Sequence, residues 1–253
     1  MELARTMMRR LAIFVEGYTE LLFVDRLIQE IAEKSKIAIQ HRKIRGGGKK
    51  SGLSKKIVEL QTPVTTSRQS LYFLIVDCGG DNLVAQRIRE EHESLTSIGY
   101  EKILGLRDVF PAFSHADIPK LKQGLRYGVK TSLTPVQFIL SVMELEAWFL
   151  AEHNHFLQID TMLTPEVIRS NLGFDPAADD MTTRLTPAKD LVSAYNIAGK
   201  IYTKGDAKTT VDKLDYEYLY TELIERIPEL RELLDAINIF INSPDSSRDQ
   251  ILI

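Results

Sequence analysis

Two carboxylates, Glu16 and Asp77, each stand at the end of a short apolar run and just ahead of glycine. Glu16 follows residues 11–15 (LAIFV), and Asp77 follows residues 71–76 (LYFLIV). Apolar runs without alternation are typical of strands that are buried on both faces of a parallel sheet. Ligands of open α/β sheets bind beyond the carboxyl ends of the strands, so both acids should be displayed at one edge of a sheet.

Two carboxylates at one sheet edge favour a divalent cation between them. Without a cation, neighbouring like charges raise each other's pKa. Mg²⁺ and Mn²⁺ prefer oxygen ligands, and Mg²⁺ often uses one or two carboxylates together with substrate phosphates. We therefore predict a metal-dependent phosphodiesterase that acts on nucleic acid. Glu16 and Asp77 are its expected Mg²⁺ or Mn²⁺ ligands, and Glu16 is also a candidate general base.

Further acids could complete such a site. Asp108 ends another apolar run, whereas Asp81 stands just before a helical pattern, where a capping role is the stronger interpretation. Glu144 and Glu146 are two positions apart, so on a strand they would share a face, whereas on a helix they would diverge by roughly 200° and only one would face the ligand. We expect Glu146, before Glu144, to join Glu16 and Asp77 in catalysis.

Basic residues near these acids are candidates for binding phosphate. Arg107 precedes Asp108, and Lys49 and Lys50 lie in the glycine-rich segment RGGGKKSG at residues 45–52. That segment lacks the Gly-x-x-x-x-Gly-Lys-Ser/Thr pattern of a P-loop, so nucleoside triphosphate cleavage by that route is not expected. The formal net charge is −3 and the pI is near 6.0, so any contact with nucleic acid must come from a local basic patch.

The order of the elements predicts an α/β fold with a mostly parallel central sheet flanked by helices. Thr19 is a candidate cap for the first helix, and Glu20 complements the dipole of that helix. A short helix is expected at residues 53–60. Strands are expected at residues 11–15, 37–44, 71–76, 103–109 and 136–143, and further helices at 21–31, 82–98 and 144–153.

The second part of the chain has a different character. Helical patterns at residues 165–171, 187–198 and 216–240 are separated by polar segments, and no strand of comparable quality follows residue 155. We therefore predict an α/β domain at residues 1–155 and a helical C-terminal subdomain at residues 156–253 that packs on it.

The cysteine content and the N-terminal sequence indicate the cellular compartment. Cys78 is the single cysteine, so no internal disulfide forms, and no Cys/His cluster indicates zinc. The apolar run after Arg9 and Arg10 is too short for a signal or membrane segment. A cytoplasmic protein without membrane association is expected, and assembly as a homo-oligomer remains open.

The segments IFVEGYTELLFVDRLI and YFLIVDCGGD together resemble the Toprim domain, the metal-binding fold of topoisomerases, primases and OLD-type nucleases. VMELEAWFLAE and YTKGDAKTTVDKLDYEYL resemble a family of small bacterial Toprim-like proteins related to the OLD branch. By this resemblance Glu16 matches the acid after the first strand, and Asp77 matches the first acid of the Toprim Asp-x-Asp pair. The second acid of that pair falls on Gly79, which is a departure from the family pattern.

The resemblance implies a nuclease effector in phage defence, with a separate ABC-type ATPase as a partner. The departure at Gly79 instead favours an alternative, a non-catalytic Toprim-like module that binds nucleic acid or a protein partner. A third alternative is an enzyme that uses the same acids to modify a small nucleotide.

Overall fold

The central element of the computed structural model is a six-stranded sheet with the strand order β3-β2-β4-β1-β5-β6. Every neighbouring pair is parallel except β2 and β3, which are antiparallel. The structure describes residues 8–47, 52–63, 65–66, 68–80 and 82–243. The predicted α/β fold with a mostly parallel sheet is confirmed. The strands are β1 (Arg9–Val15), β2 (Ile37–Arg45), β3 (Lys56–Gln61), β4 (Leu71–Asp77), β5 (Lys102–Asp108) and β6 (Val136–Ser141).

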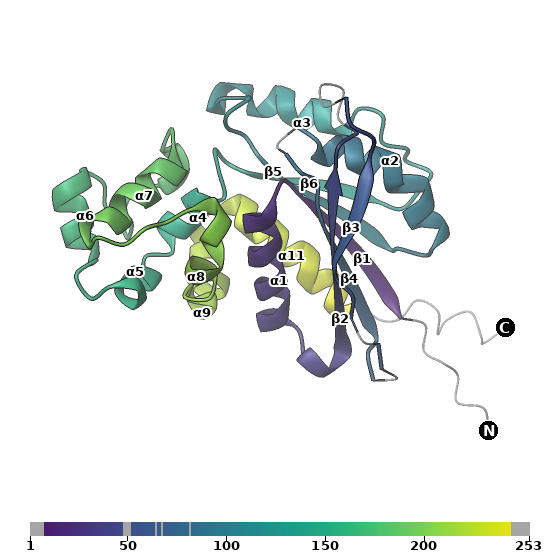
Figure 1. Cartoon of the computed structure of the whole chain (residues 1–253), viewed down its shortest axis with the longest axis horizontal. Coiled ribbons are helices and arrows are strands. Elements are labelled where there is room, and N and C mark those ends of the chain that lie inside the picture. Colours follow the sequence, from purple (N-terminus) through teal and green to yellow (C-terminus); the bar gives the residue numbers. More distant parts are fainter. Residues whose placement is uncertain (1–7, 48–51, 64, 67, 81, 244–253) are drawn as a thin grey trace.

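Helices cover both faces of this sheet (Figure 1). α1 and α11 lie on one face, and α2 and α3 lie on the other. The α-helices are α1 (Tyr18–Ile31), α2 (Val84–Ser97), α3 (Ile118–Arg126), α4 (Glu146–Ala151), α5 (Asn154–Ile159), α6 (Pro165–Leu172), α7 (Pro187–Ile197), α8 (Ala207–Val211), α9 (Tyr216–Tyr218), α10 (Ile224–Arg226) and α11 (Pro228–Asn242). Short 3-10 turns are η1 (Lys34–Lys36), η2 (His115–Asp117), η3 (Met181–Thr183) and η4 (Lys204–Asp206), and η5 (Leu219–Leu223) is a π-helical turn.

The strand β1 is buried on both faces because its side chains are apolar at successive positions. Leu11 and Ile13 belong to the core that α1 and α11 cover, whereas Ala12 and Phe14 belong to the core under α2. Successive side chains of a strand point to opposite faces, so this run fills two separate cores. Burial of this kind places β1 at the centre of the sheet and its carboxyl end at the middle of the sheet edge.

Two predicted local structures are wrong. Residues 53–60 do not form a helix, because Lys56–Gln61 pair as an edge strand with β2. Most of its side chains are exposed, and pairing with the neighbouring strand, rather than local periodicity, decides its state. Thr19 does not cap α1: Gly17 is the N-cap, and the Gly17 N–H donates to the Glu20 carboxylate at 3.0 Å.

The C-terminal helices form a lobe beside the carboxyl edge of the sheet, and the last helix returns to the sheet (Figure 1). α4 packs on α7, and α1 packs on α8. In the described part of the chain, no strand follows β6. One hydrophobic core continues from the α1 face of the sheet into this lobe, and the domain boundary expected at residue 155 remains a prediction.

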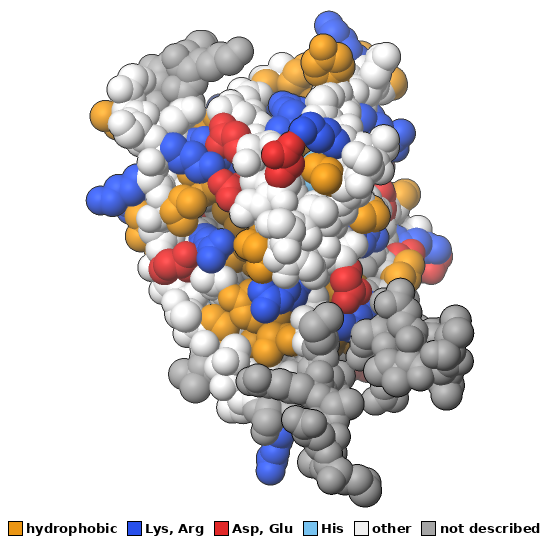
Figure 2. Space-filling model, turned by 90° about the vertical axis from the view of Figure 1, so that its right-hand side faces the viewer, with side chains coloured by type: hydrophobic (Ala, Val, Ile, Leu, Met, Phe, Trp, Pro, Cys, Tyr) orange, Lys and Arg blue, Asp and Glu red, His pale blue; other side chains and the backbone are white. Residues whose placement is uncertain are grey.

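Two features bear on the expected partners: the charges on the surface and the length and apolar character of the helices. Figure 2 shows a face on which basic, acidic and hydrophobic side chains are interspersed, without one large field of either charge. Across the residues that the structure describes, no helix has the length and apolar character needed to cross a membrane.

Candidate functional site

A cleft of about 580 Å³ lies at the carboxyl edge of the sheet. The ends of β1, β2, β4 and β5 line it, together with the start of α1, Glu144, Lys204 and Gly205. Asp77 pairs in register with Val15, the residue before Glu16. The expectation that Glu16 and Asp77 lie at the same edge, on neighbouring strands, is therefore confirmed. Their roles as metal ligands remain predictions.

Glu16 and Asp77 each face a basic side chain. Lys43, at the end of β2, forms an ion pair with the fully buried Asp77. Arg107, near the end of β5, has its Nε 3.8 Å from Glu16 Oε1. Among the described residues, each acid thus has a cation from the strand beside it.

Gly79 stands where the Toprim pattern has its second acid, and its backbone excludes one. Its φ is 78°, a conformation that side-chain-bearing residues rarely adopt, and a Cβ there would lie 2.6 Å from the carbonyl oxygen of Ile44. The Gly79 N–H instead donates to Asp77 Oδ1 at 2.9 Å. The turn after β4 therefore requires glycine because it passes so close to β2.

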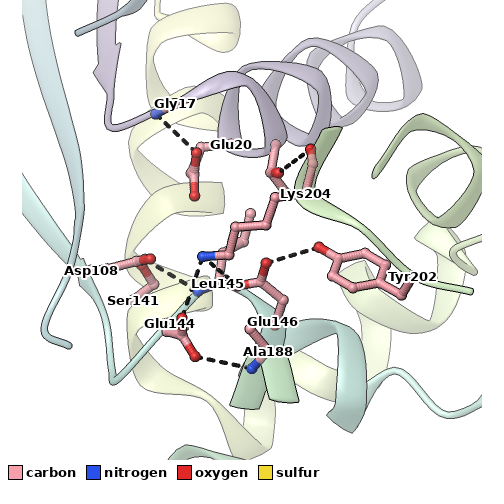
Figure 3. Close-up of polar contacts among 11 residues, drawn as sticks. Gly17, Glu20, Asp108, Ser141, Glu144, Leu145, Glu146, Ala188, Tyr202 and Lys204 are labelled. Carbon is pink, nitrogen blue, oxygen red and sulfur yellow. Dashed lines mark hydrogen bonds and ion pairs between the residues drawn. The ribbon is translucent and has the colours of Figure 1, made fainter. Parts of the chain in front are cut away.

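A second group of acids surrounds the ammonium of Lys204 (Figure 3). We call these residues the Lys204 cluster: Glu20, Asp108, Glu144, Glu146 and Lys204. The four carboxylates are each at most 7% exposed, whereas the lysine side chain is 52% exposed. Lys204 Nζ lies 3.3 Å from Glu144 Oε1 and 3.6 Å from Glu146 Oε2. Four acids therefore share one ammonium group.

Neighbouring groups hold these carboxylates in place. Asp108 ends β5 and accepts hydrogen bonds from the Ser141 hydroxyl and, at 3.1 Å, from the Leu145 N–H. The Tyr202 hydroxyl donates to Glu146 Oε1 at 2.8 Å. The Ala188 N–H at the start of α7 donates to Glu144 Oε2 at 3.0 Å. Strand β5, the lobe and the segment before α8 thus all contribute to fixing one site.

Of Glu144 and Glu146 only one lines the cleft, as predicted, but it is Glu144 and not the favoured Glu146, which is fully buried. The two acids do not lie on one helix, because α4 begins at Glu146 and Glu144 precedes it. The chain turns at Met143, whose φ is 66°. Because of this turn, both carboxylates reach Lys204.

The Lys204 cluster contains two residues that the sequence argument did not assign to the site, Lys204 and Glu20. Glu20 lies in the first turn of α1, four positions after Glu16, and only its contribution to the helix dipole was expected. The usable signal was the spacing in EGYTE. A strand that ends at Glu16 and a helix that starts directly after Gly17 bring both acids to one edge of the sheet.

Three acids of the Lys204 cluster, Glu20, Asp108 and Glu146, have raised pKa values. Burial, followed by the charge of Glu146, raises the pKa of Glu20 to about 7. Burial and the charges of Glu20 and Glu146 raise the pKa of Asp108 well above its usual range. Burial also raises the pKa of Glu146. For Lys204, burial lowers the pKa, but the surrounding carboxylates outweigh it, and the net pKa is raised. Full ionisation of these carboxyl groups is therefore disfavoured with one ammonium beside them.

The remaining predicted site residues are placed differently. Arg107 is buried, donates to Asn82 Oδ1 at 2.7 Å and lies over the ring of Phe113, so Glu16, Asn82 and Phe113 surround it. Its expected role in phosphate binding remains a prediction. Lys49, Lys50 and Asp81 lie outside the described residues.

The donor set suits a hard divalent cation, although the side chains are not gathered around one. Within the described ranges, no group of three or more His, Cys, Asp or Glu side chains is arranged to hold a metal ion. In the Lys204 cluster the ammonium lies among the acids. An added cation would favour the ionised form of buried carboxyl groups whose pKa values are raised. Carboxylate oxygens are also preferred Mg²⁺ ligands.

Comparisons with known proteins assign no family to this chain. No family model matches it, and no curated protein matches it. One solved structure resembles it weakly, a "putative cell surface hydrolase from Lactobacillus plantarum WCFS1". It has 10% sequence identity and a TM-score of 0.34, over 97% of each chain.

Proposed function

We propose that this protein hydrolyses phosphodiester bonds of nucleic acid with the help of Mg²⁺ or Mn²⁺. One observation carries the proposal: four buried carboxylates at the carboxyl edge of the sheet share the single ammonium of Lys204. Removing several acids from water around one cation is costly unless a higher positive charge balances them. Their raised pKa values support the same interpretation.

The residues that would hold the metal are Glu20, Asp108 and one or both of Glu144 and Glu146. Bound there, the metal would neutralise the scissile phosphate and stabilise the leaving oxygen. Glu16 and Asp77 flank the same cleft, but Arg107 and Lys43 already balance their charges. We therefore rank them after the acids of the Lys204 cluster as metal ligands.

The chain's own groups would then bind substrate and move protons. Arg45 is exposed at the cleft and Lys43 is half-buried there, so both are suited to hold phosphate oxygens. Glu16 faces the cleft beside the Lys204 cluster and is suited to accept a proton from the attacking water. Lys204, once displaced from the acids, would be available to an anionic substrate.

A cleavage assay with charge-neutral variants tests the proposal. Plasmid DNA, single-stranded DNA and tRNA are incubated with Mg²⁺, Mn²⁺ or EDTA, and wild type is compared with Glu20→Gln and Asp108→Asn. Glu217→Gln, a substitution at a helical acid outside the cleft lining, is the matched control. Metal-dependent cleavage that both cluster variants lose and the control keeps is the expected result. Cleavage that neither variant affects would refute the proposed site.

The second candidate function is a non-catalytic module that binds nucleic acid or a protein partner. The pairing of Asp77 with Lys43 and of Glu16 with Arg107 favours it, because these acids then need no metal. Binding of nucleic acid in EDTA without cleavage in either metal would select this alternative.

A role in phage defence and an ABC-type ATPase partner are proposals that rest on the Toprim and OLD resemblance alone. Co-expression with a candidate ATPase followed by co-purification would test the partnership. The small-nucleotide alternative predicts product formation from mononucleotides in the same metals.

A further inference from the structure

The cleft at the sheet edge has two chemically different walls. Four residues of the Lys204 cluster line one wall, namely Glu20, Asp108, Glu144 and Lys204. Lys43, Arg45 and Gly46, at the end of β2, line the other wall, where Lys43 is 28% exposed while paired with Asp77 and Arg45 is exposed. The β2 wall therefore offers exposed basic groups that a phosphate backbone would contact.

An aromatic ring, Tyr18, lies on the same cleft. It is the first residue of α1, directly after the N-cap Gly17, and it is 44% exposed, whereas its neighbour Thr19 is buried. Phe110, which follows β5, is half-buried and also lines the cleft. The helix start is firmly held because Gly17 bonds to Glu20 and the Thr19 hydroxyl donates to the carbonyl oxygen of Lys204 at 3.3 Å. An exposed ring on a rigid helix start is a suitable surface for a flat ligand.

We propose that Tyr18 stacks on a base of single-stranded nucleic acid whose phosphates lie along Lys43 and Arg45. This inference rests on the proposed function, because it names the form of nucleic acid that the same cleft accepts. Aromatic stacking together with a basic track is the usual way in which proteins hold single strands without reading their sequence. It requires a base whose face is open, which a paired and stacked duplex does not offer.

The size of the cleft agrees with this ligand. A volume of about 580 Å³ is within the range of small-molecule sites, so it takes a nucleotide unit rather than a stretch of helix. A single strand would enter with one base on Tyr18, and its next phosphate would pass toward the acids where the metal would bind.

Binding of a fluorescein-labelled 20-mer of dT, measured by anisotropy in EDTA, tests the inference. The competitors are an unlabelled 20-base-pair duplex and dTMP. We expect the single strand to bind more tightly than either, and Tyr18→Leu to weaken its binding by roughly 5- to 100-fold, as expected from the loss of one stacked base. Tyr18→Phe, which keeps the ring face, should bind as wild type does.

Tyr220→Ala is the matched control, because Tyr220 is also 44% exposed but lies outside the cleft lining. Circular dichroism verifies that each variant is folded. Wild-type affinity in Tyr18→Leu, or equal affinity for duplex, single strand and dTMP, would overturn the inference. Cleavage is scored separately in Mn²⁺. Loss of cleavage with intact, Tyr18-dependent binding counts against the proposed function, and cleavage with Tyr18-independent binding counts against this inference.

Discussion

The Lys204 cluster and the Glu16–Asp77 pair lie at one sheet edge, but their charges are balanced differently. Asp77 has its own ammonium in Lys43, and Glu16 has the guanidinium of Arg107 nearby. In the Lys204 cluster four acids share one half-exposed lysine. Glu16 and Asp77 thus each have a basic partner from a neighbouring strand, whereas in the Lys204 cluster the carboxylates outnumber the described cations.

The difference teaches that a position at a strand end and the balance of charge around it are separate properties of a site. Asp77 sits at the end of β4, and a lysine of the neighbouring strand reaches it directly. Asp108 sits at the equivalent place on β5, where its nearest groups are other acids and neutral donors. Equivalent places on parallel strands therefore give different chemistry, depending on which side chains the adjoining elements supply.

The largest expected effect is on activity. Asp108→Asn keeps an oxygen for the Ser141 and Leu145 hydrogen bonds but removes the charge that would hold a metal. We expect Mg²⁺-dependent cleavage to fall by about 100-fold or more, which is the scale of losing a catalytic group. Initial rates at saturating Mg²⁺ provide the measurement. A loss below threefold would contradict the assignment of Asp108 to the metal site.

The glycine beside Asp77 should tolerate substitution poorly. Gly79→Ala places a Cβ 2.6 Å from the Ile44 carbonyl oxygen at a φ of 78°, and we expect a loss of about 2–4 kcal/mol in the free energy of unfolding. Gly173→Ala is the matched control, because Gly173 has a φ of 75° but open space around it, so only about 1 kcal/mol should be lost there. Urea denaturation measures the free energy of unfolding of both variants. Equal losses would show that the close contact with Ile44 of β2 does not add to the cost of Gly79→Ala.

Neutralising one acid from each region should change stability in opposite directions. Asp77→Asn leaves the Lys43 ammonium without its charged partner, and we expect a loss of about 1–3 kcal/mol at pH 8. Glu20→Gln removes a charge that the folded state disfavours, and we expect a gain of about 1–3 kcal/mol at pH 8 without added metal. Urea denaturation in EDTA measures both, and two changes of the same sign would contradict the comparison.

The gain from Glu20→Gln should depend on pH. A raised pKa in the folded state stabilises the protein at low pH, and this contribution is lost as the pH rises through about 7. The difference between wild type and Glu20→Gln should therefore be large at pH 8 and small at pH 4. Stability curves at both pH values provide the check.

The smallest expected effect is on metal affinity. Mg²⁺ competes with the proton on Glu20, so its affinity should fall by about tenfold between pH 8 and pH 6, because one proton must then be released. Isothermal titration calorimetry in two buffers measures both the affinity and the proton release. A pH-independent affinity would exclude Glu20 as a ligand.

Much of the fold was predictable because the apolar runs are unambiguous. Residues 71–76 became β4 with its acid at the sheet edge, and 103–109 became β5. Residues 53–60 were mistaken for a helix because pairing with β2, which local sequence does not encode, decides that an exposed edge strand forms. The strand ends predicted Glu16, Asp77 and Asp108. Glu20 and Lys204 were not assigned to the site, because neither one stands at the end of a strand.

The sequence by itself determined that acids stand at the carboxyl ends of β1, β4 and β5, because apolar runs fix strands and strand ends fix the residues that follow. Only the tertiary structure decided which of these acids are neutralised. Lys43, Arg107 and Lys204 come from segments far apart in the chain, and charge balance at a distance of a few ångströms depends on how those segments pack.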